Sequence, residues 1–513
     1  MTSTETAAPT AVAPDRDHAA PAADDGLTRV FIAAFGLFGW MFGLRKLSDN
    51  GYLWHVRTGQ VILDSGVPHH DIYSFTIRGH AWIAQSWLAE LLYGVVNRYF
   101  GGHGLQVLSA ATGALVAMLM AWTALRLTGD RVRGVGVAVI AGAAVLSPWS
   151  ERPLALGLLA LAVVVVVVEL PDSRVGRYPL IVLPIVFWIW GNVHGTWVLG
   201  MVYVGLHVLA RWIDGHPCWT KDRERTLVLA VLVSVAILLI NPYGIGLLTF
   251  PVVLVGRGGV LQSVVEWRSP DFREIPSAIY AIWLVTFIAI GARSWRRYSR
   301  CDLIVAVPFL LLAFWAQRNI SLAAIVSLPI AARACAPATV DRVGANAVVG
   351  RGAAGGADIA VQTRAQSSRV SQVAFVAIVA LGGLWLVNTL QAPAYNLNAY
   401  PVKALSRLDR DGELGPKTRL LTTDAWAGYV ISKYWPKQPV FFDDRYDTYP
   451  VAQSKDYLRL LWGKPGWQGI LDRNQIALVV WPKNDPLTQL LAESPQWQRQ
   501  RGDKVSAVFE RRL

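Results

Sequence analysis

The sequence predicts a polytopic α-helical membrane protein with about eleven spans, followed by a small C-terminal α/β domain. The first reason is composition. Of the 513 residues, 53% are hydrophobic and only 16% are charged, whereas a soluble globular chain has about 25% charged residues. The second is arrangement, because the apolar residues form long blocks separated by short basic loops. The third is a change of pattern near residue 400, after which strand-like and helix-like segments alternate.

Residues 1–27 come before the body of the first apolar block. They are rich in Ala, Pro, Thr and Asp and have no apolar periodicity, which predicts a disordered cytoplasmic tail. No basic stretch leads directly into a short apolar core, so we do not expect a signal peptide.

Eleven apolar segments are candidate membrane spans. A spanning helix needs about 20 residues, and several segments are shorter, so we expect some helices to be tilted or shielded by neighbours. Ten segments form a transmembrane domain over 28–336, and the eleventh lies apart from it. The segments are 28–46, 104–126, 133–149, 153–170, 177–191, 195–213, 226–242, 276–292, 302–316, 319–336 and 371–390.

The loops between these segments predict the orientation of the chain. With the N-terminus in the cytoplasm, the cytoplasmic loops hold most of the Lys and Arg residues, as the positive-inside rule requires, with Arg45 and Lys46 as a local exception. Residues 337–370, rich in Gly, Ala and Val, are expected to form a flexible cytoplasmic linker. The sequence therefore predicts a multi-pass protein of the cytoplasmic (inner) membrane, with residues 391–513 as an extracytoplasmic α/β domain.

The pattern of that domain predicts short strands alternating with helices. The expected strands are 419–423, 440–443, 476–481 and 506–511. The expected helices are 425–434, 453–463, 467–474 and 487–493.

The loop 47–103 is the longest on the predicted outer face. Long connections are usually functional or disordered, and the apolar and aromatic content of this one argues against disorder. Two amphipathic helices lying in the membrane interface, at 51–65 and 86–99, are expected. The alternative for its aromatic residues is simple anchoring at the interface. The candidate site residues in the loop are Asp49, His55, Arg57, Asp71 and Glu90.

The other predicted outer loops also carry polar groups at the ends of apolar segments. Such groups are expensive at membrane depth and tend to face a cavity, so several on one face indicate a shared pocket. Taken singly, each could instead be a helix cap, and His194 in particular suits a capping role. For Asp444 and Arg445 the alternative is an Asp-Arg pair that closes the end of a strand. The candidates are His194, Glu266, Arg268, Arg318, Asp444 and Arg445.

Several short sequence runs in these loops and in the C-terminal domain resemble motifs of the same known protein family. They are Asp49…Trp54-His55…Gly59, Gly66-Val67-Pro68…Asp71…Ser74-Phe75-Thr76, Trp87-Leu88…Glu90, Trp190-Gly191-Asn192-Val193-His194-Gly195, Asn241-Pro242-Tyr243-Gly244, Glu266-Trp267, Arg318-Asn319, Trp426-Ala427-Gly428-Tyr429 and Phe442-Asp443-Asp444-Arg445. Together they resemble bacterial GT-C-type integral membrane glycosyltransferases over most of residues 28–513.

The resemblance implies a GT-C-like transmembrane domain and transfer of a sugar from a polyprenyl-phosphate donor to an envelope acceptor on the outer face. An acidic residue in the first outer loop is the usual catalytic base of such enzymes, and here it would be Asp49. Many relatives have a second acid two positions later. Gly51 stands there in this sequence, so an Asp-x-Asp metal pattern is incomplete.

The chemistry of glycosyl transfer fits these residue types. A carboxylate can accept the proton of an attacking hydroxyl. The departing phosphate needs cations or a metal ion, and Arg57, Arg268 and Arg318 could supply bidentate guanidinium contacts. His55, His194 and Glu266 could position the substrate or bind a divalent cation. The residues point to no certain cofactor, and Mg²⁺ or Mn²⁺ is the option that phosphate chemistry suggests.

Two other functions are compatible with the same features. A transporter or flippase of lipid-linked sugars would need a polar path or inverted repeats, and the polar candidates instead gather at one face. A non-catalytic scaffold for envelope assembly would use the C-terminal domain to bind partners. Nucleic-acid binding is disfavoured because the net charge of +13 follows from basic loops. The sequence also has no phosphate-binding P-loop, His-Glu-x-x-His zinc motif or cysteine cluster.

Overall fold

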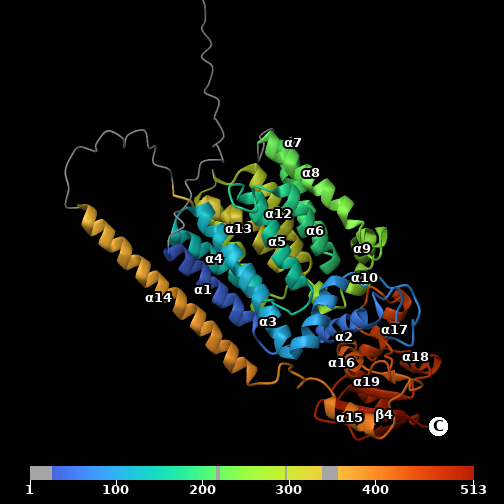
Figure 1. The fold of residues 1–513 in the computed structure, drawn as a ribbon. Helices are drawn as coiled ribbons and strands as arrows, with labels where there is room; N and C mark the ends of the chain where they lie inside the picture. The colour runs from blue at the N-terminus through green and yellow to red at the C-terminus, as the bar shows by residue number, and fades with distance from the viewer. Residues whose placement is uncertain (1–25, 215–219, 295–296, 338–355, 513) are drawn as a thin grey trace, which may run out of the picture.

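The computed structural model describes residues 26–214, 220–294, 297–337 and 356–512. The predicted tail, residues 1–27, lies outside the described residues except for its last two, which begin the first helix. A large bundle of helices occupies most of the molecule, and the C-terminal domain sits at one end of it (Figure 1).

Each predicted apolar segment corresponds to one helix, and all but the last of these helices form the bundle. Because their side chains are apolar on nearly every face, these helices bury one another and leave apolar surface outside. The helices are α1 (Gly26–Gly43), α3 (Trp87–Thr128), α4 (Arg131–Leu146), α5 (Leu154–Glu169), α6 (Pro179–Val193), α7 (Trp197–Asp214), α8 (Lys221–Leu238), α11 (Ile275–Arg293), α12 (Arg300–Trp315), α13 (Ile320–Cys335) and α14 (Gly356–Leu390).

Four helices in the described part of the chain are long and apolar enough to cross a membrane: α1, α3, α11 and residues Arg369–Leu390 of α14. Several others are apolar but shorter than 18 residues, α5 and α6 among them. The helical membrane-protein class is therefore confirmed, whereas the number of spans stays a prediction.

Small residues bring α1 against α3. A Cβ atom on Gly39 would lie 2.2 Å from the carbonyl oxygen of Gly113, and one on Gly43 would lie 2.6 Å from Cα of Ala110. Only glycine fits at these two positions, which is how small residues let backbones approach in membrane helix pairs. On the outside of the bundle, α14 lies beside α1 and exposes apolar side chains such as Val373 and Leu384 (Figure 1).

Two helical pieces at the end of the bundle match the predicted interface helices. The first is α2 (Asn50–Ser65), and the second is the start of α3, before the non-helical backbone at Gly101 (φ 61°). The pieces meet closely, because a Cβ atom on Gly59 would lie 1.8 Å from the carbonyl oxygen of Glu90. The predictions of helices at 51–65 and 86–99 are confirmed. Short elements complete this end of the bundle: α9 (Ile245–Val255), α10 (Gly258–Leu261), η1 (Val265–Trp267) and η3 (Gln317–Asn319).

The C-terminal domain contains a four-stranded sheet with the order β1-β2-β4-β3. Its strand β1 (Leu420–Leu421) pairs in parallel with β2 (Leu478–Pro482), while β4 (Ser506–Arg511) is antiparallel both to β2 and to β3 (Trp497–Gln500). The helices around it are α15 (Val402–Arg410), α16 (Asp424–Tyr434), α17 (Val451–Leu461), α18 (Trp467–Arg473) and α19 (Pro486–Glu493). The predicted small α/β domain is confirmed.

Three details of the prediction differ from the structure. Residues 440–443 are not in the sheet, because Val440 instead bridges to Ser74 of the first long loop. Strand β3 and helix α15 are absent from the prediction. Strand β3 has no clear apolar period, whereas α15 does have an apolar face, formed by Ala404, Leu405 and Leu408. The predicted linker 337–370 is also wrong in its second part. Helix α14 already begins at Gly356, in a stretch of Ala, Gln and Arg residues that favour helix.

The first long loop and the C-terminal domain are joined by backbone and side-chain contacts. The N–H of Val440 donates to the carbonyl of Tyr73, and the N–H of Phe75 donates back to Val440, each over 3.0 Å. Helix α16 lies against α2, where a Cβ atom on Gly428 would be 2.5 Å from the carbonyl oxygen of Asn50. The loop is thereby held between the bundle and the domain.

Candidate active site

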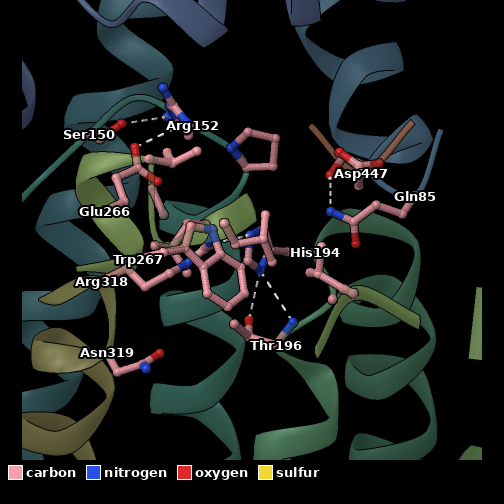
Figure 2. A pocket seen from close by; sticks show the side chains of 18 of the residues that line it. Gln85, Ser150, Arg152, His194, Thr196, Glu266, Trp267, Arg318, Asn319 and Asp447 are labelled. Carbon is pink, nitrogen blue, oxygen red and sulfur yellow. Dashed lines mark hydrogen bonds and ion pairs between the residues drawn. The ribbon is translucent and has the colours of Figure 1, made fainter. Parts of the chain in front are cut away.

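A cavity of about 540 Å³ lies where the bundle, the first long loop and the C-terminal domain meet (Figure 2). Helices α5, α7, α9 and α12 supply apolar lining residues, and loops, helix ends and the C-terminal domain supply most of the polar ones. The apolar residues include Leu158, Leu199, Phe250, Leu254 and Leu312. The charged and histidine residues in the lining include His55, Glu90, Arg152, His194, Glu266, Arg318, Asp444 and Arg445.

Arg152 is where three carboxyl groups converge. It stands two residues before α5, and its Nε donates to Oδ1 of Asp49 over 2.7 Å. Nη1 lies 3.0 Å from Oε1 of Glu266, and Nη2 lies 3.5 Å from Oδ2 of Asp444. Burial would lower the pKa of Arg152, but these carboxylates raise it above its ordinary value. The guanidinium is therefore a permanently charged part of the cavity wall.

Asp49 is held by hydrogen bonds at the start of α2. Its Oδ1 accepts from the backbone N–H groups of Gly51 and Tyr52, which makes it the N-cap of the helix. Its Oδ2 accepts from the hydroxyl of Ser150 over 2.9 Å. Burial by itself would raise the pKa of Asp49, but the charge and hydrogen bond of Arg152 lower it below the ordinary value. Asp49 lies behind Arg152 and is not among the described residues that line the cavity.

Asp444 has the opposite electrostatic environment. Burial raises its pKa to about 8; nearby Asp443 and Asp49 add to the increase, and Arg152 opposes it. Within the described residues, its Oδ1 has no hydrogen-bond partner. A cavity-lining carboxyl group in this state can exchange a proton near neutral pH.

His194 and Arg318 form a second polar pair on the wall. Nη2 of Arg318 lies 3.2 Å from Nε2 of His194, whose Nδ1 lies 2.9 Å from the hydroxyl of Thr196. Burial, followed by the charge of Arg318, lowers the pKa of His194 well below its ordinary value, so the ring is neutral. The Arg318 guanidinium also lies over the ring of Trp267, 4.7 Å from its centre (Figure 2).

Arg318 has no ion pair with any carboxylate in the described part of the chain. The charge of Glu266 acts on it from a greater distance. Burial lowers its pKa, and an arginine nonetheless stays protonated at neutral pH. A desolvated guanidinium of this kind favours a phosphate ligand.

His55 and Glu90 line the cavity from α2 and α3. Nδ1 of His55 lies 2.8 Å from Oε1 of Glu90, and both side chains are almost fully buried. Oε2 of Glu90 has no partner within the part of the chain that the structure describes. The pair can orient a polar substrate group, as the sequence predicts.

Besides Asp49, three other predicted site residues do not line the cavity. Arg57 donates to the side chain of Gln60 and to the carbonyl of Trp435. Arg268 donates to two backbone carbonyls of its own loop. Asp71 is buried against Arg445, with Oδ1 2.6 Å from Nη2. These hydrogen bonds and the ion pair stabilise the loops and the docked domain, although Nε of Arg57 has no partner among the described residues.

The sequence-based candidates did not include Arg152. The available signal was a charged residue in the short predicted outer loop between two apolar segments, the Ser150–Arg152 stretch. Its importance depends on Asp49, Glu266 and Asp444, which are far from it and from one another along the chain, so spacing alone could not reveal it.

The carboxylates of this site do not fit a divalent cation as they stand. In the described residues no group of three or more His, Cys, Asp or Glu side chains could hold a metal ion. The oxygens that would bind one face the Arg152 guanidinium instead. An acid at position 51 would require Asp444 to shift, because a Cβ atom on Gly51 would lie 2.6 Å from Oδ2 of Asp444. For the optional Mg²⁺ or Mn²⁺, the residues that the structure describes therefore offer no ready ligand set.

No protein-family model and no curated protein matches this chain. Three crystal structures are similar in fold. The Archaeoglobus fulgidus oligosaccharyltransferase in its apo form has a TM-score of 0.51 at 11% identity, over 89% of this chain and 69% of that one. Its complex with Zn and sulfate has a TM-score of 0.48, also at 11% identity, over 89% and 68%. ArnT from Cupriavidus metallidurans bound to undecaprenyl phosphate has a TM-score of 0.48 at 15% identity, over 95% and 98%.

The likeness to the archaeal enzyme covers 89% of this chain. The protein has a GT-C fold. At this identity the likeness carries the fold alone, so the activity of this GT-C protein has to be argued from its own cavity.

Proposed function

We propose that this protein transfers a sugar from a polyprenyl-phosphate donor to an envelope glycan, lipid or protein acceptor. The observation that carries the proposal is the cavity itself, which combines an apolar lining from the bundle with arginine side chains, Arg152 and Arg318 among them. A lipid-linked phosphate has the same two parts, an apolar chain and an anionic head. A cavity complementary to both selects this class of donor.

In this proposal the phosphate head of the donor lies against the arginines. Arg318 carries a desolvated charge beside neutral His194, and Arg152 presents its guanidinium on the same wall. As the bond between the sugar and the phosphate breaks, negative charge grows on the phosphate. Fixed cations in a site shielded from water stabilise this charge without reorganising.

The polyprenyl tail of the donor would lie against the bundle helices. Leu158 of α5, Leu199 of α7 and Phe250 of α9 line the cavity. An apolar chain in contact with them stays in a lipid-like environment, so no separate soluble pocket is required. In the predicted orientation the cavity opens on the extracytoplasmic face, where the acceptor would be an envelope component.

Two carboxyl groups compete for the role of the base. Asp49, predicted from the sequence, accepts four hydrogen bonds and has a lowered pKa, so it binds a proton weakly. Asp444 lines the cavity, has a pKa of about 8 and leaves Oδ1 without a partner in the described structure. A base works best when its pKa is near the working pH. We therefore assign proton acceptance to Asp444 and the positioning of Arg152 to Asp49.

The test uses purified protein in detergent with a lipid-linked sugar fraction extracted from the native membranes. Transfer cleaves the donor, so polyprenyl phosphate should appear with the wild-type protein and should be reduced about 10²- to 10³-fold with Arg318→Ala. Arg473→Ala, which removes an exposed arginine from the C-terminal domain, is the matched control and should match the wild type. A flippase or a scaffold would release no polyprenyl phosphate, and that result would end the proposal.

A further inference from the structure

We infer that Arg152 is the resident cation of this site and takes the place that a divalent metal ion would occupy between the carboxylates and the donor phosphate. The inference deepens the proposed function and rests on it for the identity of the phosphate. It predicts a glycosyl transfer that needs no metal ion.

The geometry around Arg152 is that of a bound cation. Asp49, Glu266 and Asp444 approach it at 2.7, 3.0 and 3.5 Å, from three different parts of the chain. A fourth oxygen, Oδ1 of Asn50, accepts from Nη2 over 3.1 Å. Oxygen atoms of carboxylates and amides are also the ligands that hard divalent cations prefer. The guanidinium occupies the centre of such a set.

Arg152 also faces the space that a ligand would occupy. Of its five N–H groups, Nε donates to Asp49 and one on Nη2 donates to Asn50, while Glu266 and Asp444 are ion-paired with it at 3.0 and 3.5 Å. The guanidinium lines the cavity. A phosphate oxygen can accept from it, just as a metal ion held by protein oxygens keeps a position for its substrate.

The positive charge of the site equals that of a divalent metal ion when Arg318 is counted together with Arg152. Arg152 and Arg318 both line the cavity, and together they bring two positive charges, the charge of one divalent ion. When the acceptor oxygen attacks, a new bond forms at the sugar carbon and the bond from that carbon to the phosphate oxygen breaks. The electron pair moves to the phosphate and the proton of the acceptor moves to a carboxylate. The arginines neutralise the charge on the departing phosphate.

Two measurements test the inference. The first is transfer by wild-type protein after exhaustive treatment with EDTA, with and without added Mn²⁺. We expect the rates to agree within about twofold, because the cation is part of the chain. A loss of activity in EDTA that Mn²⁺ restores would overturn the inference.

The second measurement needs no activity. Electron paramagnetic resonance of Mn²⁺ added to purified protein reports binding directly. We expect no stoichiometric site in the wild type or in Arg152→Lys. We expect about one Mn²⁺ per chain in Arg152→Ala, where three carboxylates lose their cation, and none in Arg152→Ala combined with Glu266→Gln. Arg473→Ala, which frees only Asp456, should bind none.

The outcomes separate the two proposals. A stoichiometric Mn²⁺ site in the wild type that Glu266→Gln removes would overturn the role of Arg152. The role would also be overturned if Arg152→Ala protein elutes as a folded monodisperse species and binds no Mn²⁺. If the wild type releases no polyprenyl phosphate under any condition, the proposed function fails, whereas the Mn²⁺ titration still decides whether Arg152 stands in a cation site.

Discussion

Nε of Arg152 lies 2.7 Å from Oδ1 of Asp49, although the two residues are 103 positions apart. The contact ties the loop before α5 to the first turn of α2, and both side chains are largely buried. Because Asp49 also caps α2, a single carboxylate fixes the start of a helix and the direction of a guanidinium. The position of the charge on the cavity wall therefore depends on the fold of the first long loop.

Replacing Asp49 by Asn separates these two tasks. Asn is as good an N-cap as Asp, so α2 should keep its cap and the protein should stay folded. The charge that orients Arg152 is lost, and we expect the transfer rate to fall about 10- to 100-fold while its pH dependence keeps its shape, a size typical of a lost positioning contact. Asp130→Asn, at the N-cap of α4, is the matched control and should leave the rate unchanged. An unaltered rate in Asp49→Asn would remove Asp49 from the mechanism.

The pH dependence of transfer should report Asp444. Its pKa is raised to about 8, mainly by burial, so the group is largely protonated at pH 7 and cannot accept a proton until it ionises. We expect the rate to rise about tenfold per pH unit below that pKa and to level off above it. Asp444→Asn should be slow at every pH and should lack this rise. A wild-type rate that does not change between pH 6 and pH 9 would contradict the assignment.

The same residue should affect stability in a predictable direction. Because its pKa is raised in the folded protein, the folded state binds this proton more tightly than the unfolded state. The resulting stability is fully present below the ordinary pKa of 3.8 and is lost as the pH rises toward 8. Thermal unfolding in detergent should therefore show a smaller decrease in Tm between pH 6 and pH 9 for Asp444→Asn than for the wild type. Equal decreases would mean that Asp444 has an ordinary pKa.

Much of the fold could be predicted because hydrophobicity is a local property. Each predicted apolar segment is a helix, and α2 could be found from its amphipathic pattern. The strand predicted at 440–443 failed for a non-local reason, since Val440 pairs with the loop residue Ser74 rather than with the sheet. In the sequence, an apolar run that pairs with a loop looks the same as one that pairs within a sheet.

The candidate site was predictable only in part. His194, Glu266 and Arg318 could be proposed because polar groups at the ends of apolar segments tend to face a cavity, and the structure brings them to one. Arg57 and Arg268 have the same chemistry but do not line the cavity, and each donates to backbone carbonyls instead. Which arginine lines the cavity depends on tertiary contacts, and Arg152 was overlooked for the same reason.

Arg445 should be essential for stability. Nη2 of Arg445 lies 2.6 Å from Asp71 and 2.7 Å from Asp443, and both carboxylates are fully buried. The guanidinium also lies over the ring of Trp82, 4.5 Å from its centre. Arg445→Met keeps much of the volume but leaves two buried carboxylates without a cation, and breaking a buried pair in this way costs about 3–5 kcal/mol.

We expect this loss to appear as a large drop in Tm. We also expect faster proteolysis of the first long loop and of the C-terminal domain, because Asp71 and Arg445 join these two parts. Lys437→Met removes an exposed ion pair with Asp409 and is the matched control. Exposed pairs contribute about 0–1 kcal/mol, so its Tm should hardly change. If Arg445→Met instead kept the wild-type Tm and only weakened donor binding, the pair would belong to the substrate site, as the sequence predicts, and the docking role would be wrong.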